Sequence, residues 1–252
     1  MRRSVILVAA TAAISFGISQ AAYAADMPIK APVYTKAPPP VVAYNWSGIY
    51  FGGQAGGAWS DTTVTNVQGT HFFNFVGDSR SISDSAFLGG AFLGAQWQIN
   101  SIVVGIEGGA AWGKLSDTVH APGPFALDNY KAEIKDLYSI TGRIGFAADR
   151  FLIYAKGGWA TAKVSTQSDE VPAFQHFGNS SERHNGYVIG AGIDYAFWNN
   201  LIAGIEYDYY DLRTKTHTGV DSINFSPYVV DVHPKVQTVM GRLSYKFPVG
   251  AP

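Results

Sequence analysis

The chain has 252 residues, with 18 lysines and arginines, 19 aspartates and glutamates, and a formal net charge of −1 at pH 7. This balance does not favour a nucleic-acid partner, which would call for a strongly basic surface. The chain contains no cysteine, which excludes disulfides, thiolate catalysis and cysteine metal sites.

The N-terminal residues have the pattern of a secretory signal peptide. Arg2 and Arg3 precede an apolar stretch, residues 4–16, that is too short to cross a bilayer as a helix, and Ala22-Tyr23-Ala24 follows as a small-residue cleavage site. We expect residues 1–24 to be removed, which takes away two of the 18 basic residues and leaves 16 against 19 acidic ones. An uncleaved N-terminal anchor is the alternative.

Residues 25–44 are rich in proline. Such a segment favours a polyproline II conformation and cannot enter the interior of a sheet. We expect a periplasmic spacer between the cleavage site and a domain that covers residues 45–252. Binding of this segment by another protein is the alternative.

From Trp46 onward the recurring pattern is alternation of apolar and polar residues, with no convincing helical period. In residues 102–113, IVVGIEGGAAWG, one face carries Val104, Ile106 and Trp112 without interruption, whereas Glu107 shares the other face with small residues such as Gly105. We expect eight strands with this division, at residues 46–59, 86–99, 102–113, 137–148, 152–163, 186–197, 201–212 and 236–247.

The connections between these strands alternate in length. Tight turns are expected at 100–101, 149–151 and 198–200, and long polar loops at 60–85, 114–136, 164–185 and 213–235. This is the plan of an all-β protein, an eight-stranded antiparallel up-and-down transmembrane β-barrel of a bacterial outer membrane, with its short turns in the periplasm and its long loops outside the cell. A soluble eight-stranded barrel of the lipocalin type, with its apolar face inward, is the alternative.

Aromatic residues of the apolar faces fall near the strand ends, which predicts a membrane girdle at each interface. The expected girdle residues are Trp59, Trp97, Trp112, Phe146, Trp159, Tyr195, Phe197, Tyr207, Tyr209, Tyr245 and Phe247. A soluble sandwich has no reason to produce two such girdles.

The same facing assignment places four acids and four bases inside the barrel. We expect a lumen charge network of Glu107, Arg143, Lys156, Asp194, Glu206, Asp208, Arg242 and Lys246. An eight-stranded barrel is just wide enough for its side chains to fill, and buried charges persist when they are paired and hydrogen-bonded. We therefore favour a polar plug, with a narrow or gated pore as the alternative.

The sequence predicts no catalytic, cofactor-binding or metal-binding residues. All six histidines fall in the expected long loops, and neither a G-x-S-x-G nor an H-E-x-x-H motif is present. His184 and Asp211 could approach the outer rim, where barrel enzymes place such groups, but solvated loop residues are the favoured interpretation.

Three stretches resemble a known family. WSGIYFGGQAGGAW (46–59), with a W-x-G-x-Y-x-G-G-x-x-G pattern, DRFLIYAKGGWA (149–160) and residues 186–212 are similar to the small porin-like outer-membrane barrels of alphaproteobacteria, the immunogenic major outer-membrane proteins, which share the fold of the OmpA barrel. The AADMP start and the proline-rich spacer also match.

The resemblance implies a role in envelope integrity and surface loops that act as antigens, and weak porin activity is sometimes ascribed to the family. We expect outer-membrane lipid, lipopolysaccharide and the barrel assembly machinery as partners, and no cofactor. The chain departs from the family in two places. Residues 248–252 follow the SYKF (244–247) that should serve as the terminal assembly signal, and Met240 stands at an inward position where a polar residue is expected.

Overall fold

The computed structural model describes residues 44–68, 76–120, 129–170, 175–220 and 227–248. The expected signal peptide and nearly all of the expected spacer lie outside the described residues, as do residues 249–252. Within the described part, no helix is long and apolar enough to cross a membrane.

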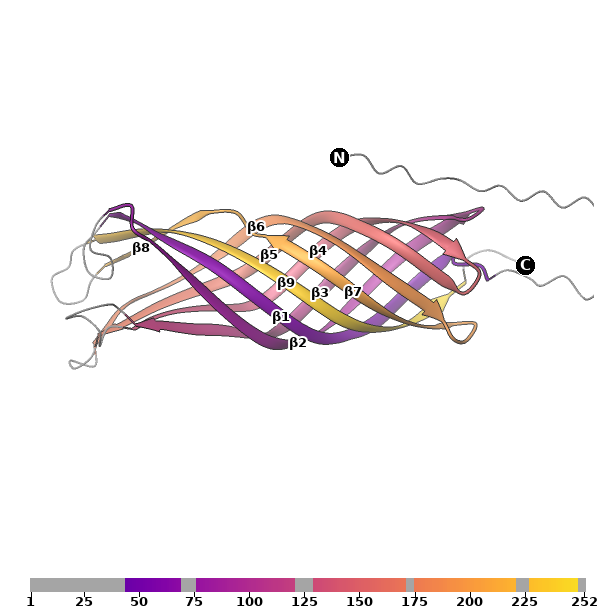
Figure 1. Ribbon diagram of the computed structural model, residues 1–252, viewed down its shortest axis with the longest axis horizontal. Coiled ribbons are helices and arrows are strands. Elements are labelled where there is room, and N and C mark those ends of the chain that lie inside the picture. The colour runs from indigo at the N-terminus through magenta and orange to yellow at the C-terminus, as the bar shows by residue number, and fades with distance from the viewer. Residues whose placement is uncertain (1–43, 69–75, 121–128, 171–174, 221–226, 249–252) are drawn as a thin grey trace, which may run out of the picture. The chain divides into compact units, whose positions relative to one another are not determined.

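The described residues form one antiparallel sheet of nine strands (Figure 1). The strands are β1 (Gly48–Gln68), β2 (Ser79–Ile99), β3 (Ile102–His120), β4 (Asn129–Ala148), β5 (Phe151–Glu170), β6 (Gln175–Ala196), β7 (Leu201–Asp211), β8 (Lys215–Val220) and β9 (Pro227–Phe247). Each strand from β1 to β6 pairs with the next one along the chain, and β9 pairs with both β7 and β8.

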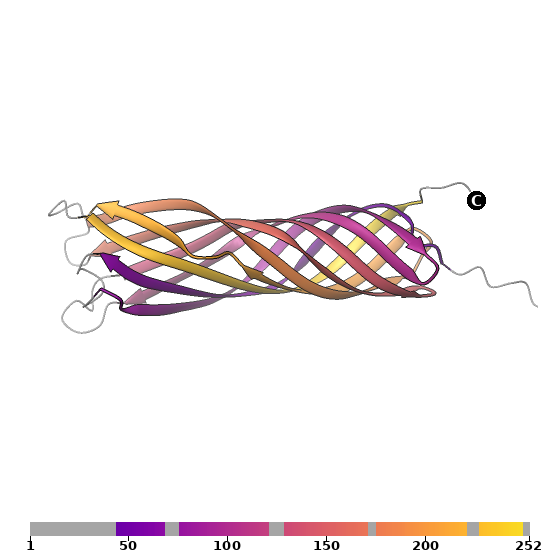
Figure 2. The same cartoon turned by 90° about the horizontal axis from the view of Figure 1, so that it is seen from above.

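The sheet closes on itself through pairing of β1 with β9, in a register that begins with Ile49 opposite Phe247. β7 and β8 pair with successive parts of β9, so they are two pieces of a single barrel strand. Arg213, which has a positive φ of 54°, lies in the interruption between them. The fold is therefore the predicted closed eight-stranded antiparallel barrel, and Figure 2 shows its tilted strands from a second side.

The tight turns lie where the sequence predicted them, after β2, β4 and β6. Asn100 and Asp149 adopt positive φ angles of 55° and 50° in the first two turns. Asparagine and aspartate tolerate this left-handed conformation better than most residues because their short polar side chains can hydrogen-bond locally.

The long loops were predicted wrongly in extent. Strands continue through most of 60–85, 114–136 and 164–185, and β8 and part of β9 occupy much of 213–235. The ladder extends because alternation persists there with reversed polarity: Val64 and Ile82 face inward, while Asp61 and Ser83 face outward and are exposed. We call this part of the barrel, beyond the level of Trp59, the extension.

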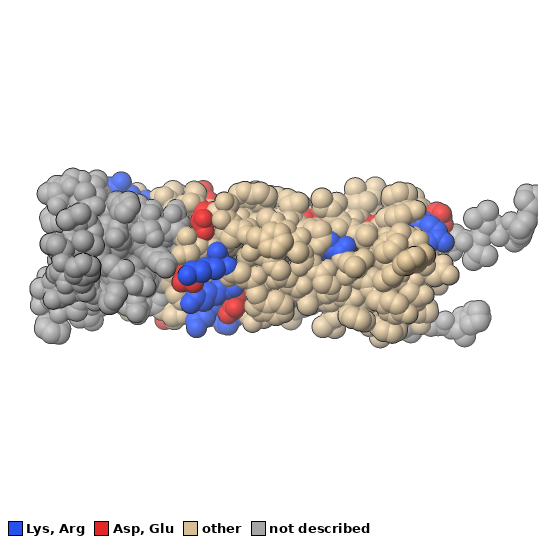
Figure 3. Space-filling view, turned by 90° about the horizontal axis from the view of Figure 1, so that it is seen from below, with Lys and Arg blue, Asp and Glu red and all other residues tan. Residues whose placement is uncertain are grey.

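The outer wall of the other part of the barrel is apolar. Ile106, Ile140 and Ile153 are each about 60% exposed, and comparable outward residues occur on every neighbouring strand. In Figure 3 a wide band with few charged side chains lies between charged groups near its two ends. A band of this kind matches the hydrocarbon-facing surface of a membrane barrel, and we call it the belt.

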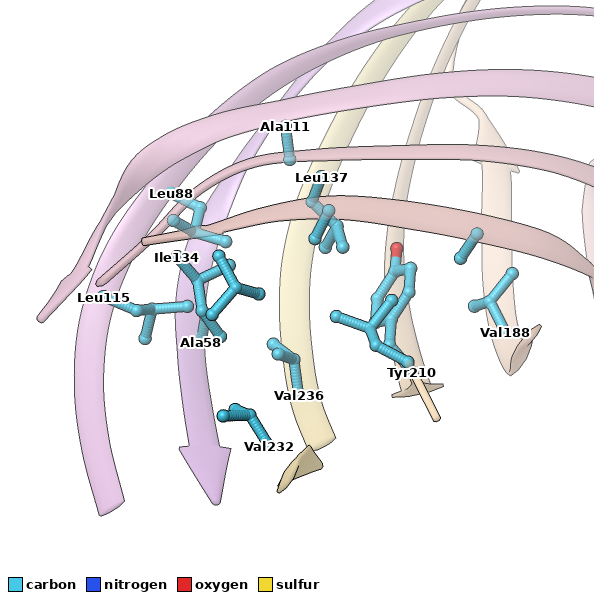
Figure 4. Packing of buried hydrophobic residues seen from close by; sticks show 14 of the residues in the cluster. Ala58, Leu88, Ala111, Leu115, Ile134, Leu137, Val188, Tyr210, Val232 and Val236 are labelled. Atoms are coloured by element: carbon cyan, nitrogen blue, oxygen red, sulfur yellow. The ribbon is translucent and has the colours of Figure 1, made fainter. Parts of the chain in front are cut away.

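The interior changes character along the barrel axis. From the outer end of the belt into the extension, a cluster of apolar side chains from all the strands except β8 fills the barrel, and Figure 4 shows members such as Leu88, Leu137 and Val236 converging. Met240 is 2% exposed and belongs to this cluster, which explains why an apolar residue occupies that inward position. Inside the belt the interior is charged.

Candidate functional site in the barrel interior

The eight charged residues expected in the lumen all lie inside the barrel. Their exposed fractions range from 1% to 8%. They reach the interior from six strands, because inward positions alternate with outward ones along each strand. The residues are Glu107 of β3, Arg143 of β4, Lys156 of β5, Asp194 of β6, Glu206 and Asp208 of β7, and Arg242 and Lys246 of β9.

Glu107 lies at the centre of a network that crosses the barrel. Its Oε2 atom accepts hydrogen bonds from Arg242 and from Tyr50, whose hydroxyl is 2.9 Å away, and lies 3.5 Å from Nη1 of Arg143. The other guanidinium nitrogen of Arg143, Nη2, donates to Asp194 at 2.9 Å. A carboxylate in an otherwise apolar segment is therefore balanced by cations from distant strands.

Lys156 joins this group to the acids of β7. Its Nζ atom lies 2.7 Å from Glu206, 3.0 Å from Asp208 and 3.7 Å from Glu107. Arg242 also donates to Glu206. Seven of the eight charges thus form one continuous network, in which every ion is paired as burial requires. Two buried atoms of the network, Nε of Arg143 and Oδ1 of Asp208, accept or donate no hydrogen bond among the described residues.

Aromatic residues complete the network, and no pattern in the sequence pointed directly to their roles. The hydroxyl of Tyr154 donates to Glu206 at 2.7 Å, and the same ring lies 3.8 Å from the guanidinium carbon of Arg143. The guanidinium of Arg242 lies at the same distance over the ring of Phe92. These contacts join residues that are up to 150 positions apart in the chain, as with Arg242 and Phe92, so spacing could not reveal them.

Lys246 lies outside this network. It is buried, it donates to the backbone carbonyl of Asn45, and its Nζ atom lies 4.1 Å from the centre of the Tyr44 ring. No carboxylate of the described residues forms an ion pair with it. The sequence placed it inward but could not show that the residues before β1 would provide its partners.

Trp46 fills the end of the interior near the short turns. It is fully buried, its indole nitrogen donates to the carbonyl of Asp149 at 3.0 Å, and its own carbonyl accepts from Gln96 at 2.7 Å. It packs with Leu152 and Ile202 in a second apolar cluster. The charged network therefore lies between two apolar layers.

Little empty space remains among these groups. The void beside Arg143, Asp194 and Arg242 has a volume of about 10 Å³, which is near the lower limit for a single water molecule. A continuous water column would need far more room than this void offers at the level of the charge network.

The expected girdle residues all lie on the outer face. Ten of the eleven are exposed, and Tyr209 is half-buried. Tyr187 was not among the predicted girdle residues, although it is exposed and is the cross-strand partner of Trp159. Its place at the start of the expected strand 186–197 was the available signal.

The histidines correct a prediction, since five of the six lie in strands and only His71 falls outside the described residues. His184 does not meet Asp211. Its Nε2 atom lies 2.8 Å from Nε2 of His217, and both rings are fully buried inside the extension. Asp211 instead lies 2.9 Å from Nε2 of His233 on the outer face. No group of three or more metal-ligating residues occurs among the described residues.

Comparison with known proteins identifies the family of this barrel. Residues 8–247 match the family model described as an outer membrane protein beta-barrel domain. The chain belongs to this family. It is a bacterial outer-membrane protein, and the strands of its belt cross the membrane.

Relatives come from alphaproteobacteria, as the sequence resemblance implied. The chain is 31% identical to the 31 kDa outer-membrane immunogenic protein of Brucella melitensis biotype 1, over 97% of this chain and all of that one. It is 29% identical to the 22 kDa outer membrane protein of Rhizobium leguminosarum bv. viciae, over 73% and 72% of the two chains.

A solved structure supports the fold. The outer membrane protein OprG from Pseudomonas aeruginosa is similar with a TM-score of 0.56 and 16% sequence identity, over 82% of this chain and 99% of that one. At this identity the likeness concerns the fold alone.

Proposed function

We propose that this protein is a structural barrel of the outer membrane, without catalytic activity and without a conducting pore, which contributes to envelope integrity. The observation that carries the proposal is the filled lumen. Seven buried charges are ion-paired with one another, and the void beside Arg143, Asp194 and Arg242 is about 10 Å³. A diffusion porin, the second candidate, would need a wide and hydrated passage.

The lumen also offers little to an enzyme mechanism. A general acid or base needs access to a substrate within hydrogen-bonding distance, whereas Glu107, Glu206 and Asp208 are all buried against cations or tyrosines. Stability does not follow from the ion pairs alone, because desolvation can offset the attraction between buried charges. We propose that the network closes the lumen and fixes the barrel in a single register.

In outer-membrane barrels, the end with the longer loops is on the outside of the cell, and the end with the short turns is in the periplasm. The Brucella relative is named an immunogenic protein. We propose that the segments joining the strands at the end of the extension are exposed on the cell surface and act as antigens here too.

Conductance measurements test the main proposal. The mature protein, refolded and inserted into planar bilayers, should give no steady ion conductance, and a conducting porin in the same preparation provides the control for detection. Insertion is verified independently by protease protection of the belt. Reproducible conductance steps from inserted protein would replace the closed barrel with the porin.

A further inference from the structure

Two positive charges face each other on the outer wall of the extension. Lys163 of β5 and Arg183 of β6 are direct cross-strand partners, and both are exposed. Like charges in this position repel each other and destabilise a sheet. The pair therefore calls for an anion that the described side chains do not supply.

Other cations near this level have acidic neighbours. Lys114 and Lys135 each lie 3.5 Å from Glu133. Lys235 on β9 is the cross-strand partner of Asp61 on β1 and of Asp211 on β7. Lys163 lies beside the β4 bulge that contains Asp136. Within the described part of the chain, neither Lys163 nor Arg183 forms an ion pair, so two unpaired cations stand together on the wall at β5 and β6.

The guanidinium of Arg183 is held on the β5 side of its own strand. Its central carbon lies 5.6 Å from the centre of the Tyr138 ring. Tyr138 is on β4 and pairs with Thr161 of β5, which in turn pairs with Asn185 of β6. The side chain of Arg183 therefore reaches across β5, the strand that carries Lys163, and both cations are available to one ligand.

Lys163 and Arg183 also lie at the depth in the membrane where lipid headgroups are expected. Trp159 and Tyr187, both exposed, are partners on the same two strands, four residues closer to the belt. Four residues of a strand tilted by about 40° span roughly 10 Å along the membrane normal. Aromatic girdles mark the interface, so the cations stand at the level of lipid headgroups.

An apolar groove begins directly below the cations. It has a volume of about 530 Å³, and its lining includes Tyr138, Trp159, Ile140 and the small residues Gly108 and Ala110. Tyr138 therefore contacts Arg183 on one side and the groove on the other. A ligand with a phosphate and an acyl chain would satisfy both features at once, whereas a free phosphate ion would leave the groove unused.

We propose that Lys163 and Arg183 bind the phosphate of a lipid headgroup in the outer leaflet, and that one acyl chain of this lipid lies in the groove over Gly108. Arginine and lysine bind phosphate oxygens through short charge-assisted hydrogen bonds. The site concerns the outer wall, so it does not depend on whether the lumen conducts.

Binding of diphosphorylated lipid A to the mature protein in a neutral detergent tests the proposal, with bound lipid counted by native mass spectrometry. Lys163→Gln combined with Arg183→Gln should weaken binding about tenfold or more. Gly108→Leu should weaken it several-fold by filling the groove, since a Cβ added at Gly108 meets no atom within 4 Å. Lys235→Gln, which removes a cation with two acidic neighbours, is the matched control and should leave binding unchanged.

Four results would overturn the proposal. The first is an equal loss of binding from Lys235→Gln and from the double variant, which would indicate general charge attraction. The second is equal binding of the same lipid after removal of its phosphates. The third is displacement of the lipid by inorganic phosphate at a similar concentration, which would point to a soluble anion. The fourth is unchanged binding in Gly108→Leu, which would mean that no acyl chain lies in the groove.

Discussion

The belt and the extension carry their polar side chains on opposite faces of the same strands. On β9, Lys246 and Arg242 face inward in the belt, beneath an outer surface that includes the exposed Leu243. In the extension the inward residues are Val236 and Val232, which are fully buried. The alternation of the backbone is unbroken between them, and only the chemistry of the two faces changes places.

This difference shows that the surroundings of a barrel decide which face is polar. Where lipid surrounds the wall, apolar side chains gain nothing from turning inward, and charges can be satisfied only inside. Where water surrounds it, burial of the apolar cluster removes nonpolar surface from water and stabilises the extension as in a soluble protein. One chain thus holds both kinds of core along a single axis.

A substitution in the charged interior of the belt should lower the folding stability more than a substitution anywhere else in the barrel. Glu107→Leu leaves Arg242, Arg143 and Lys156 with one carboxylate fewer. Removal of one partner from a buried ion pair costs about 3–5 kcal/mol. We expect a barrel that assembles but unfolds at a lower urea concentration, as followed by the shift in electrophoretic mobility between folded and unfolded forms.

Glu133→Leu is the control in the extension. Glu133 lies on the outer face and pairs with Lys114 and Lys135, both at least half exposed, at 3.5 Å. Exposed ion pairs contribute about 0–1 kcal/mol, so the urea midpoint should hardly move. Unchanged stability in Glu107→Leu, together with new ion conductance, would mean that the lumen is hydrated and that the two interiors do not differ as described.

The outer surfaces of the belt and the extension should differ in how much an introduced arginine lowers the folding stability. This difference should be smaller than that between the two interiors, but still large. Ile106 is 61% exposed in the belt, and an arginine near the bilayer midplane costs about 2–4 kcal/mol. Thr63 faces outward in the extension, where a surface substitution normally changes stability by about 0.5 kcal/mol or less. We expect Ile106→Arg to lower folding stability in lipid vesicles and Thr63→Arg to leave it unchanged. Equal costs would place both positions in the same medium.

The sequence predicted the belt well because, within the belt, the apolar residues of each strand stay on one face along its whole length. This constant alternation is enough to predict the tight turns and the inward position of Glu107. The extension was taken for loops because Val64, Ile82 and Val232 carry the apolar character on the face that is polar in the belt. A strand assignment that requires one constant polar face ends at this reversal, although the hydrogen-bonded ladder continues.

The interior could be predicted in its charges but not in its contacts. The alternation along the strands places both Glu107 and Arg242 inside the barrel, but it does not determine which cation pairs with which acid. That choice depends on height and tilt, which set the distances across the barrel. Only the three-dimensional structure shows that Trp46 closes one end of the barrel. The same holds for Tyr154, which links Glu206 to Arg143.

The smallest expected effect concerns the histidine pair inside the extension. Burial lowers the pKa of His217 to about 4, and burial also lowers the pKa of His184. Nearby, Lys215 and Glu182 form an ion pair at 2.7 Å, and the carbonyl of Arg213 lies 3.3 Å from Nδ1 of His184. The positive charge of Lys215 lowers both pKa values, and the negative charge of Glu182 raises them.

The sign of the pH dependence follows from these shifts. A histidine in the unfolded chain takes up its proton near pH 6.5, before the buried pair does, so the unfolded state binds more protons between about pH 6.5 and about pH 4. Local stability of the extension should therefore fall as the pH drops through this window, which amide hydrogen exchange in β6 and β8 would measure.

Carboxylates titrate at the lower end of the window, so the informative comparison is with His184→Leu combined with His217→Leu. This double variant keeps an apolar pair at the same place and should lose the dependence between about pH 7 and about pH 5. If it retains the full dependence, other groups control the acid response, and the histidine pair is only a hydrogen-bonded part of the apolar core.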